Sequence, residues 1–131
     1  MALGEQIAGL AHIGIRVHDL ARSRAFYERL GFRWAWGPYG PEPVGAMTHA
    51  SGLELNFIVN APDAQRPNIL MDVAERYAGI THLALKIADV ATTESELEQA
   101  GIAVSGRRGS NPVQALFIRD PDGNVIELAA D

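Results

Sequence analysis

The sequence predicts an α+β fold built from two tandem βαβββ modules, and three observations support this prediction. The segment at residues 11–21 recurs at residues 81–91, with a constant offset of 70 residues. In both copies an alternating strand pattern is followed by an Asp, a helical pattern and a Gly. Three short strand-like runs then follow each helical pattern. A chain of 131 residues that repeats a half-sized unit is expected to form one domain from two copies.

The opening strand of each module alternates polar or small residues with apolar ones. In the first module His12, Gly14 and Arg16 share one face, and the apolar residues between them share the other. The second module repeats this pattern with His82 and Ala84. We expect the apolar face to pack on the helix. The small residue two positions after each His leaves room beside the imidazole on the opposite, concave face.

The helix of each module has recognisable signals at both ends. Asp19 and Asp89 stand at N-cap positions, where a carboxylate oxygen accepts from the first free backbone N–H groups. Gly31 and Gly101 stand at the position after the helix, which favours a left-handed conformation. Apolar residues at helical spacing lie between these signals in both copies. The sequence therefore predicts one short amphipathic helix in each module.

Three strands are expected after each helix. The predicted ranges are residues 32–36, 46–50 and 53–59 in the first module, and 102–106, 113–119 and 124–129 in the second. A turn at residues 120–123, Asp-Pro-Asp-Gly, separates the last two strands. Arg119 directly precedes this turn, and we expect it to contact the turn or the linker, with anion binding as the alternative.

The boundaries follow from these elements. Module 1 is expected at about residues 8–60, a linker at about 61–79 and module 2 at about 80–131, within a single domain covering residues 1–131. The linker contains Pro62, Pro67 and Gly79, which interrupt regular structure.

Composition excludes several classes of function. Sixteen acidic against eleven basic residues give a net charge of −5, which disfavours a nucleic-acid partner held by phosphate attraction. The chain has no Cys, so disulfides, thiolate metal sites and a Cys nucleophile are excluded. The N-terminal residues do not resemble a signal peptide, and no apolar run approaches the roughly 18 residues of a membrane span. We therefore expect a cytoplasmic protein without a membrane partner, acting on a small-molecule substrate.

Two carboxylates stand in otherwise apolar strands. Glu54 lies between two Leu residues, and Glu127 lies between Ile126 and Leu128. Residues 52–55 resemble residues 125–128 at an offset of 73, which three extra loop residues in the second copy would explain. Each Glu is then directed away from the apolar face. A carboxylate in such a strand is costly to bury unless it is paired or bound to a metal.

The recurrence of His and Glu favours a metal site. A single strand His is more often a hydrogen-bonded structural residue, and a single Glu is more often solvated. Both types recur here, and His12, Glu54, His82 and Glu127 would supply two nitrogen and two oxygen donors. Such a set suits a divalent ion of Zn, Ni, Co, Mn or Fe with open positions for water or substrate.

Two tryptophans are candidate walls of a substrate pocket. Trp34 and Trp36 are two residues apart in a predicted strand, and regular alternation places them on the same face as Phe32. Aromatic residues in this pattern are equally well explained as core residues.

The motifs described above resemble those of the vicinal oxygen chelate superfamily. This superfamily includes glyoxalase I, extradiol dioxygenases, fosfomycin-resistance transferases, methylmalonyl-CoA epimerase and bleomycin-resistance proteins. The resemblance covers nearly the whole chain and rests on residues 12–17 (HIGIRV), 19–20, 26–27, 30–32, 82–85 (HLAL) and 120–128 (DPDGNVIEL). It implies that the two modules form a curved mixed sheet, an incomplete barrel around a metal site.

The chain is most similar to short bacterial glyoxalase I. That resemblance implies His12, Glu54, His82 and Glu127 as metal ligands, with Ni or Co preferred, and Arg16 as a residue that helps to bind glutathione as cosubstrate. A glutathione-binding Asn is expected four residues after the first Glu, where this sequence has Ile58.

The leading hypothesis is a metal-dependent lyase or isomerase of glyoxalase type that acts through an enediolate. Glu54 or Glu127 would move the proton next to a metal-polarised carbonyl. Arg16, with Arg107 or Arg108, would hold a carboxylate of the substrate.

Two alternatives stay open. An extradiol-type dioxygenase would use Fe(II) held by His12, His82 and Glu127, with Glu54 as a bystander. A non-enzymatic protein resembling the bleomycin-resistance proteins would bind a drug in an aromatic cleft of a dimer. We expect a homodimer in each case, because the sheets leave open edges.

Overall fold

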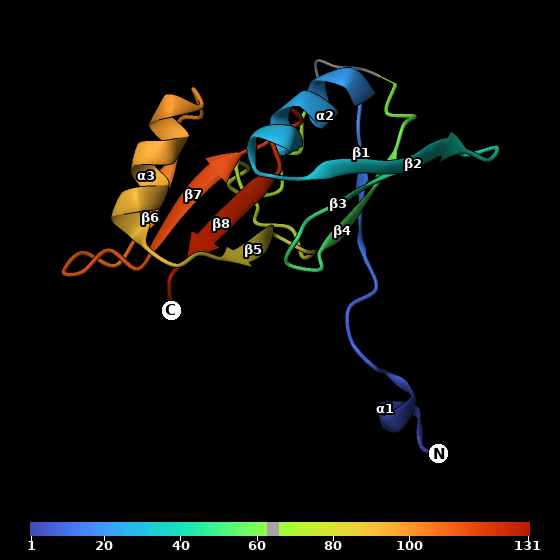
Figure 1. Ribbon diagram of the computed structural model, residues 1–131, viewed down its shortest axis with the longest axis horizontal. Coiled ribbons are helices and arrows are strands. Elements are labelled where there is room, and N and C mark those ends of the chain that lie inside the picture. Colours follow the sequence, from blue (N-terminus) through green and yellow to red (C-terminus); the bar gives the residue numbers. More distant parts are fainter. Residues whose placement is uncertain (63–65) are drawn as a thin grey trace. The chain divides into compact units, whose positions relative to one another are not determined.

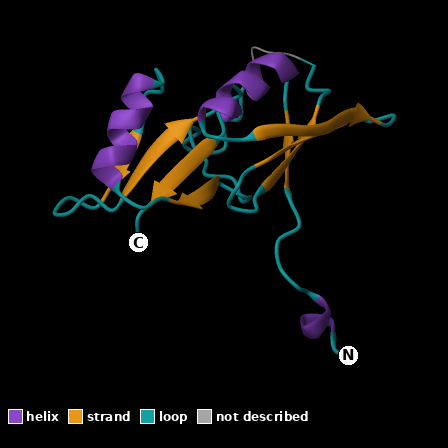
Figure 2. Ribbon diagram, viewed as in Figure 1, coloured by secondary structure: helices purple, strands orange, loops and turns teal. Residues whose placement is uncertain are grey.

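The computed structural model describes residues 1–62 and 66–131, which divide into two compact units, Met1–Asp63 and Ala64–Asp131 (Figure 1). Each unit contains one ten-residue helix and one four-stranded mixed sheet (Figure 2). Neither sheet closes into a barrel. The predicted α+β fold with two βαβββ modules is confirmed. In the described part of the chain, no helix has the length and apolar character needed to cross a membrane.

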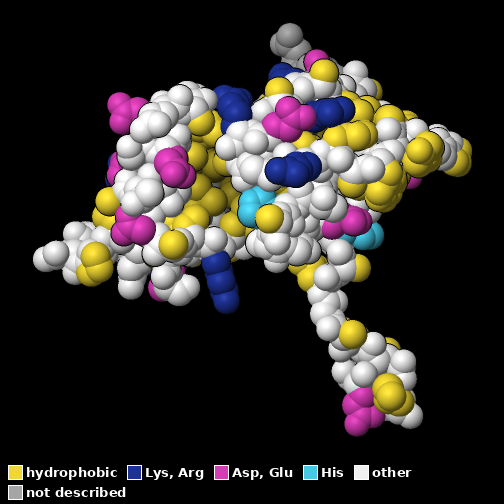
Figure 3. All heavy atoms as spheres, in the orientation of Figure 1, with side chains coloured by type: hydrophobic (Ala, Val, Ile, Leu, Met, Phe, Trp, Pro, Cys, Tyr) yellow, Lys and Arg dark blue, Asp and Glu magenta, His cyan; other side chains and the backbone are white. Residues whose placement is uncertain are grey.

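The first unit follows the predicted order, with a short helix added before it. Its elements are α1 (Leu3–Gln6), β1 (Ile13–Arg16), α2 (Leu20–Arg29), β2 (Arg33–Tyr39), β3 (Val44–Thr48) and β4 (Glu54–Ile58). The sheet order is β1-β4-β3-β2. β1 pairs with β4 in parallel, and the other pairs are antiparallel. The short helix α1, which the sequence patterns do not predict, lies in a segment whose hydrophobic side chains are exposed (Figure 3).

The second unit repeats this topology. Its elements are β5 (His82–Lys86), α3 (Val90–Gln99), β6 (Gly106–Arg108), β7 (Ala115–Arg119) and β8 (Val125–Ala129). The sheet order is β5-β8-β7-β6, and β5 pairs with β8 in parallel. The crossover between these parallel strands runs through α3, β6 and β7. The first and last strands of each unit are therefore neighbours in space.

The helix ends are formed as predicted. Asp19 Oδ1 accepts from the backbone N–H of Arg22 at 3.1 Å, and Asp89 Oδ2 accepts from that of Thr92 at 2.7 Å. Gly31 and Gly101 have φ values of +91° and +73°, in the region that glycine adopts most easily. Each helix is thus limited to ten residues by groups within its own module.

One face of each sheet forms the core. In the first unit Tyr27 of α2 is fully buried, and its ring centroid lies 5.4 Å from that of Phe57 on β4. In the second unit Leu97 of α3 is buried, as are Leu116 on β7 and Ile126 on β8. Alternation then directs the intervening residues of each strand toward the other face. Glu54 and Glu127, each next to buried apolar residues of its strand, are directed toward that second face.

β6 begins later than predicted. Ile102 is buried, and its N–H closes the end of α3 by donating to Leu97 O at 2.9 Å. Pairing with β7 starts only at Ser105, whose N–H donates to Phe117 O. The expected strand at 102–106 is therefore wrong at its start. The observed strand includes Arg107 and Arg108.

A bulge in β2 separates the two tryptophans. Trp34 pairs with Met47 and Trp36 pairs with Ala46, so two successive residues of β3 face two alternate residues of β2. Trp34 consequently lies on the helix side, with the Arg24 guanidinium 4.9 Å above its ring. The expectation that Trp34 and Trp36 share one face is wrong, because it assumed regular alternation through the strand.

Residues 66–79 belong to the second unit and contact its last turn. Asn68 donates from its backbone N–H to Asp122 O at 2.7 Å, and from its side chain to Asn124 Oδ1 at 2.8 Å. Arg119 donates to both carboxylate oxygens of Asp72, at 2.8 and 3.0 Å, and to Gly123 O. The expected contact of Arg119 with the turn or the linker is confirmed.

A first prediction concerns the packing of Trp34 on Gly45. A Cβ added to Gly45 would lie 2.5 Å from Trp34 Cη2, too close for any real contact. We expect Gly45→Ala to lower the free energy of unfolding by about 1–3 kcal/mol, measured by urea denaturation. Gly14→Ala is the matched control, because no described atom lies within 4 Å of its added Cβ. Equal stability of the two variants would contradict the placement of Trp34.

A second prediction concerns the Asp72–Arg119 pair. The hydrogen bonds from Arg119 hold the pKa of Asp72 below its ordinary value of 3.8. A lowered pKa in the folded state stabilises the protein above the ordinary pKa, and this stabilisation disappears as the pH falls through the lowered value. The difference in free energy of unfolding between wild type and Asp72→Asn should therefore be constant from about pH 7 to 5 and shrink below about pH 4.

Urea denaturation at a series of pH values measures this difference. Glu75→Gln is the control, because Glu75 is exposed and forms no hydrogen bond or ion pair with the described residues. A difference between wild type and Asp72→Asn that does not depend on pH would contradict the role given to the pair.

Candidate metal centre

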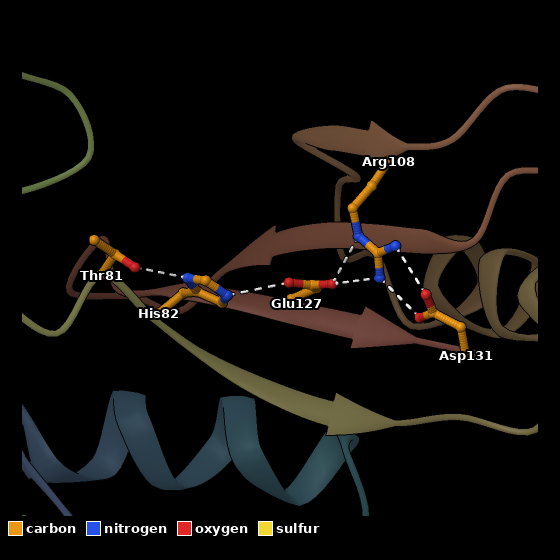
Figure 4. A network of polar contacts seen from close by, with 5 residues as sticks. All are labelled: Thr81, His82, Arg108, Glu127 and Asp131. Carbon is orange, nitrogen blue, oxygen red and sulfur yellow. Dashed lines mark hydrogen bonds and ion pairs between the residues drawn. The ribbon is translucent and has the colours of Figure 1, made fainter.

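His82 and Glu127 are brought together by the parallel pairing of β5 and β8. Glu127 lies beside Ala84, so His82 is two residues earlier on the neighbouring strand and on the same face. His82 Nε2 lies 3.1 Å from Glu127 Oε1 (Figure 4). The Glu127 side chain is 12% exposed and that of His82 is 34% exposed. The pair is thus a partly buried nitrogen and oxygen donor set at the surface of the second sheet.

The second oxygen of Glu127 is held by Arg108. Arg108 on β6 donates from Nη2 at 2.9 Å and from Nε at 3.2 Å to Glu127 Oε2. It also donates to Asp131, at 2.8 and 2.9 Å, and to Gln114 Oε1, at 3.4 Å. Hydrogen bonds from Arg108 lower the pKa of Asp131, and the two carboxylates raise the pKa of Arg108. Arg108, predicted to bind substrate, therefore orients Glu127 and leaves Oε1 directed at His82.

Thr81 and Phe117 also position the imidazole ring of His82. Its Nδ1 lies 2.8 Å from Thr81 Oγ, and its ring meets that of Phe117 edge to face, with centroids 6.3 Å apart. A hydroxyl can donate to Nδ1 or accept from it, so Thr81 suits either tautomer of the imidazole. The chain of contacts from Thr81 through His82, Glu127 and Arg108 to Asp131 is continuous (Figure 4).

The His82–Glu127 pair fits a divalent metal. Two donor atoms bound at about 2.1 Å and at right angles to each other are separated by roughly 3.0 Å. The observed separation is 3.1 Å. Imidazole nitrogen and carboxylate oxygen are common ligands of Zn, Mn, Fe, Co and Ni. His82 Nε2 and Glu127 Oε1 could therefore serve as two ligands of such an ion once Nε2 carries no proton.

The first unit presents a different residue at the position equivalent to Glu127. Gly14 corresponds to Ala84 in the repeat, and the residue beside Gly14 on β4 is Asn56. The strand register therefore aligns Glu127 with Asn56, which is 71 residues earlier in the sequence. The sequence pattern had aligned Glu127 with Glu54, 73 residues earlier. Glu54 lies two residues before Asn56, opposite Thr48. The side chain Oδ1 of Asn56 is buried and has no hydrogen-bond partner among the described residues.

His12 and Glu54 flank this position. His12 is exposed immediately before β1, and Glu54 is half-buried at the first position of β4. Neither side chain forms a hydrogen bond or ion pair within residues 1–62 and 66–131. No group of three or more His, Asp or Glu side chains able to hold a metal is found among those residues. The assignment of His12 and Glu54 as ligands stays a prediction.

Arg16 forms a small polar cluster in the first unit. Its Nε donates to Asn60 Oδ1 at 2.9 Å, and its Nη2 donates to Glu42 Oε1 at 3.1 Å. Asn60 also donates to Glu42, and these hydrogen bonds lower the pKa of Glu42. Asn60 stands four residues after Asn56. Four residues after Glu54 the sequence has Ile58. Four residues after Asn56, the residue that the strand register aligns with Glu127, it has Asn60, which contacts Arg16.

The remaining predicted residues lie apart from these groups. Arg107 forms an ion pair with Glu94 of α3, on the helix side of its sheet. Trp34 lies beneath Arg24, also on a helix side. Trp36 lies in line with Ala46 and Asn56 across the first sheet and is partly exposed. The sequence patterns did not point to Asn56 and Asn60. Only the register between β1 and β4 identifies them.

Comparisons with known proteins agree with this fold. The model of the "Glyoxalase/Bleomycin resistance protein/Dioxygenase superfamily" matches residues 9–128. The chain therefore belongs to this superfamily, and the resemblance stated from its motifs is confirmed.

Three relatives illustrate the range of the superfamily. A glyoxalase domain-containing protein, RDO1 of Mycosarcoma maydis, is 26% identical over 95% of this chain and 69% of its own length. The trypanothione-dependent glyoxalase I of Leishmania major has a TM-score of 0.66 and 26% identity, over 95% of this chain and 87% of that one. A variant of the fosfomycin resistance protein FosX of Listeria monocytogenes has a TM-score of 0.71 and 18% identity, over 95% and 92%. That FosX structure is a complex with Mn(II) and 1S,2S-dihydroxypropylphosphonic acid.

A third prediction concerns the tautomer of His82. With Oε1 of Glu127 facing Nε2 and the Thr81 hydroxyl facing Nδ1, the neutral imidazole should carry its proton on Nε2. Long-range ¹H–¹⁵N correlation spectra of the metal-free protein at about pH 8, where an ordinary imidazole is neutral, should show this form in large excess. Glu127→Ala should reduce the excess. A dominant Nδ1-protonated form in the wild type would contradict the geometry.

Proposed function

We propose that this protein is a metal-dependent enzyme of glyoxalase type, a lyase or isomerase that moves a proton next to a carbonyl of a small substrate. The observation that carries the proposal is the His82–Glu127 pair, whose donor atoms lie 3.1 Å apart while Arg108 holds the other carboxylate oxygen. Orientation of metal ligands by further hydrogen bonds is typical of functional metal sites.

The proposed ligand set is the one that the sequence repeat predicts. It consists of His12, Glu54, His82 and Glu127, of which only His82 and Glu127 are seen in contact. The sequence repeat names Glu54 as the fourth donor. A divalent ion held by these residues would act as a Lewis acid that polarises the substrate carbonyl.

The two carboxylates are suited to different tasks. Glu127 is fixed by Arg108 and forms part of a continuous network, so it is poorly placed to move with a proton. Glu54 has no partner among the described residues and is half-buried. A free carboxylate within reach of the substrate is a suitable general base. We therefore give Glu54 the task of accepting and returning the proton.

Arg16 and Asn60 are the proposed contacts for the carboxylate end of the substrate. Arg16 binds Asn60 through Nε and Glu42 through Nη2, and its Nη1 forms no hydrogen bond with the described residues. Arg16 stands where the glyoxalase I resemblance implies a glutathione-binding residue, and this supports glutathione as a cosubstrate. Trp36 is a candidate wall of the same site. The proposal includes a cytoplasmic homodimer, in which a second copy would cover the open strand edges.

A second function is favoured by Asn56. A neutral side chain at the position equivalent to Glu127 leaves His12, His82 and Glu127 as two imidazoles and one carboxylate, the ligand set of non-haem Fe(II) oxygenases. An extradiol-type dioxygenase is therefore the alternative. Glu54 would then take no part in the reaction.

A fourth prediction tests the leading function. Glu127→Gln should lower turnover of the hemithioacetal of methylglyoxal and glutathione by at least about 10²-fold, because the negative charge of a ligand carboxylate is lost. The assay follows formation of the thioester by ultraviolet absorbance after loading with Ni, Co, Zn or Mn. Glu98→Gln, an exposed change on α3, is the matched control, and thermal melting checks that both variants are folded.

Two outcomes decide between the candidates. Unaltered turnover in Glu127→Gln would remove Glu127 from the mechanism and contradict the proposal. Absence of turnover with every metal, together with oxygen uptake on catechol by protein loaded anaerobically with Fe(II), would replace it by the dioxygenase.

A further inference from the structure

We infer that Arg108 and Lys86 form a binding site for an anionic group of the substrate, and that the side chain of Asp131 occupies this site when no substrate is bound. All three residues belong to the second unit. The inference rests on the proposed function only in naming the ligand as the substrate of the metal site. It assigns that substrate a carboxylate, phosphonate or phosphate group that binds close to Glu127.

The first argument is the way in which Arg108 uses its guanidinium group. Arg108 forms five hydrogen bonds, two with Glu127, two with Asp131 and one with Gln114. A guanidinium has five N–H groups, so none is left over for a further ligand. Figure 4 shows Arg108 between the two carboxylates. A substrate group can therefore bind Arg108 only by displacing a residue that already binds it.

The second argument is that Asp131 is the partner able to leave. Its side chain is 47% exposed, whereas that of Glu127 is 12% exposed. Glu127 lies within β8, but Asp131 lies beyond the end of that strand. The N–H of Ala130 donates to Gln114 O at 2.9 Å and holds the backbone up to that point. The Asp131 carboxylate can therefore turn into water without opening the sheet.

The third argument is the geometry of the Asp131 contact. Asp131 Oδ1 accepts from Arg108 Nη2 at 2.8 Å, and Oδ2 accepts from Nη1 at 2.9 Å. Two such bonds from one guanidinium to two oxygens are the arrangement by which Arg recognises carboxylate and phosphate groups. A substrate oxyanion would form the same two bonds. The exchange replaces one anion by another, so the charge around Arg108 changes little.

The fourth argument is the position of Lys86. It pairs with Ala129 across β5 and β8, and Asp131 follows two residues later. His82 and Glu127 are related in the same way along these strands, and they are in contact. Lys86 is exposed and forms no hydrogen bond or ion pair with the described residues. Its charge is therefore available to attract an anion that takes the place of the Asp131 carboxylate.

Phosphate binding by the full chain tests the inference without relying on activity. Metal-free protein is used, because phosphate would also bind a metal ion. Inorganic phosphate is added at constant ionic strength, and ¹H–¹⁵N spectra follow the Nε–H signal of Arg108. We expect Asp131→Asn to bind phosphate about fivefold more tightly than wild type, since the competing carboxylate is lost. Adding Lys86→Gln to this variant should weaken its phosphate binding about threefold.

Glu98→Gln is the matched control. It removes one exposed negative charge from α3 and should change phosphate affinity less than about twofold, because distant surface charges are screened. Thermal melting checks that each variant is folded. Asp131→Ala, which removes the carboxylate altogether, should show the same gain as Asp131→Asn.

The outcomes separate this inference from the proposed function. The inference is overturned if neither Asp131 variant binds phosphate more tightly than Glu98→Gln does, or if Lys86→Gln leaves the affinity of Asp131→Asn unchanged. If Glu127→Gln loses turnover in that case, the proposed function stands alone. If the Asp131 and Lys86 variants behave as expected but no metal supports turnover, the anion site stands and the proposed function fails.

Discussion

The parallel pairing of the first and last strands of each unit is the constraint on which the candidate site depends. β1 beside β4 and β5 beside β8 bring together residues that are far apart in the sequence. Burial of the alternate apolar residues under a helix fixes the register, because a slip of one residue would turn every side chain to the other face. The 3.1 Å approach of His82 and Glu127 is therefore a consequence of the core on the opposite side of the sheet.

The two units keep this backbone arrangement but have diverged on the open face. Paired residues form a row across each sheet, in which a small residue precedes the donor in both units. The row is Ala84, Glu127, Phe117 and Gly106 in the second unit, and Gly14, Asn56, Ala46 and Trp36 in the first. The aromatic residue lies beside the donor in the second unit and one strand further away in the first. Phe117 therefore supports His82, whereas the residue beside Asn56 on the next strand is the small Ala46.

Local signals in the sequence predicted the fold, and non-local pairing explains what they missed. Asp19 and Gly31 end their helix through groups a few residues away, so their roles follow from the sequence alone. The β2 bulge depends on the partner strand, so the opposite faces of Trp34 and Trp36 could not be foreseen. Residues 52–55 and 125–128 resemble each other in residue type, but they do not occupy equivalent positions in the two sheets. Only the strand pairing shows that Asn56 takes the place of Glu127.

The polar network of the second unit fixes the orientation of the Glu127 carboxylate. In the part of the chain that the structure describes, Glu127 has one oxygen fixed by Arg108, and Arg108 is in turn held by Asp131. A side chain secured in this way loses little conformational entropy when it binds a further group, so a ligand that meets Oε1 finds it already oriented. The side chain of Asn56 differs, because its buried Oδ1 accepts no hydrogen bond from the described residues. The repeated fold thus keeps a donor at the same register position in both units, fixed by other side chains in the second unit and without a hydrogen-bond partner among the described residues in the first.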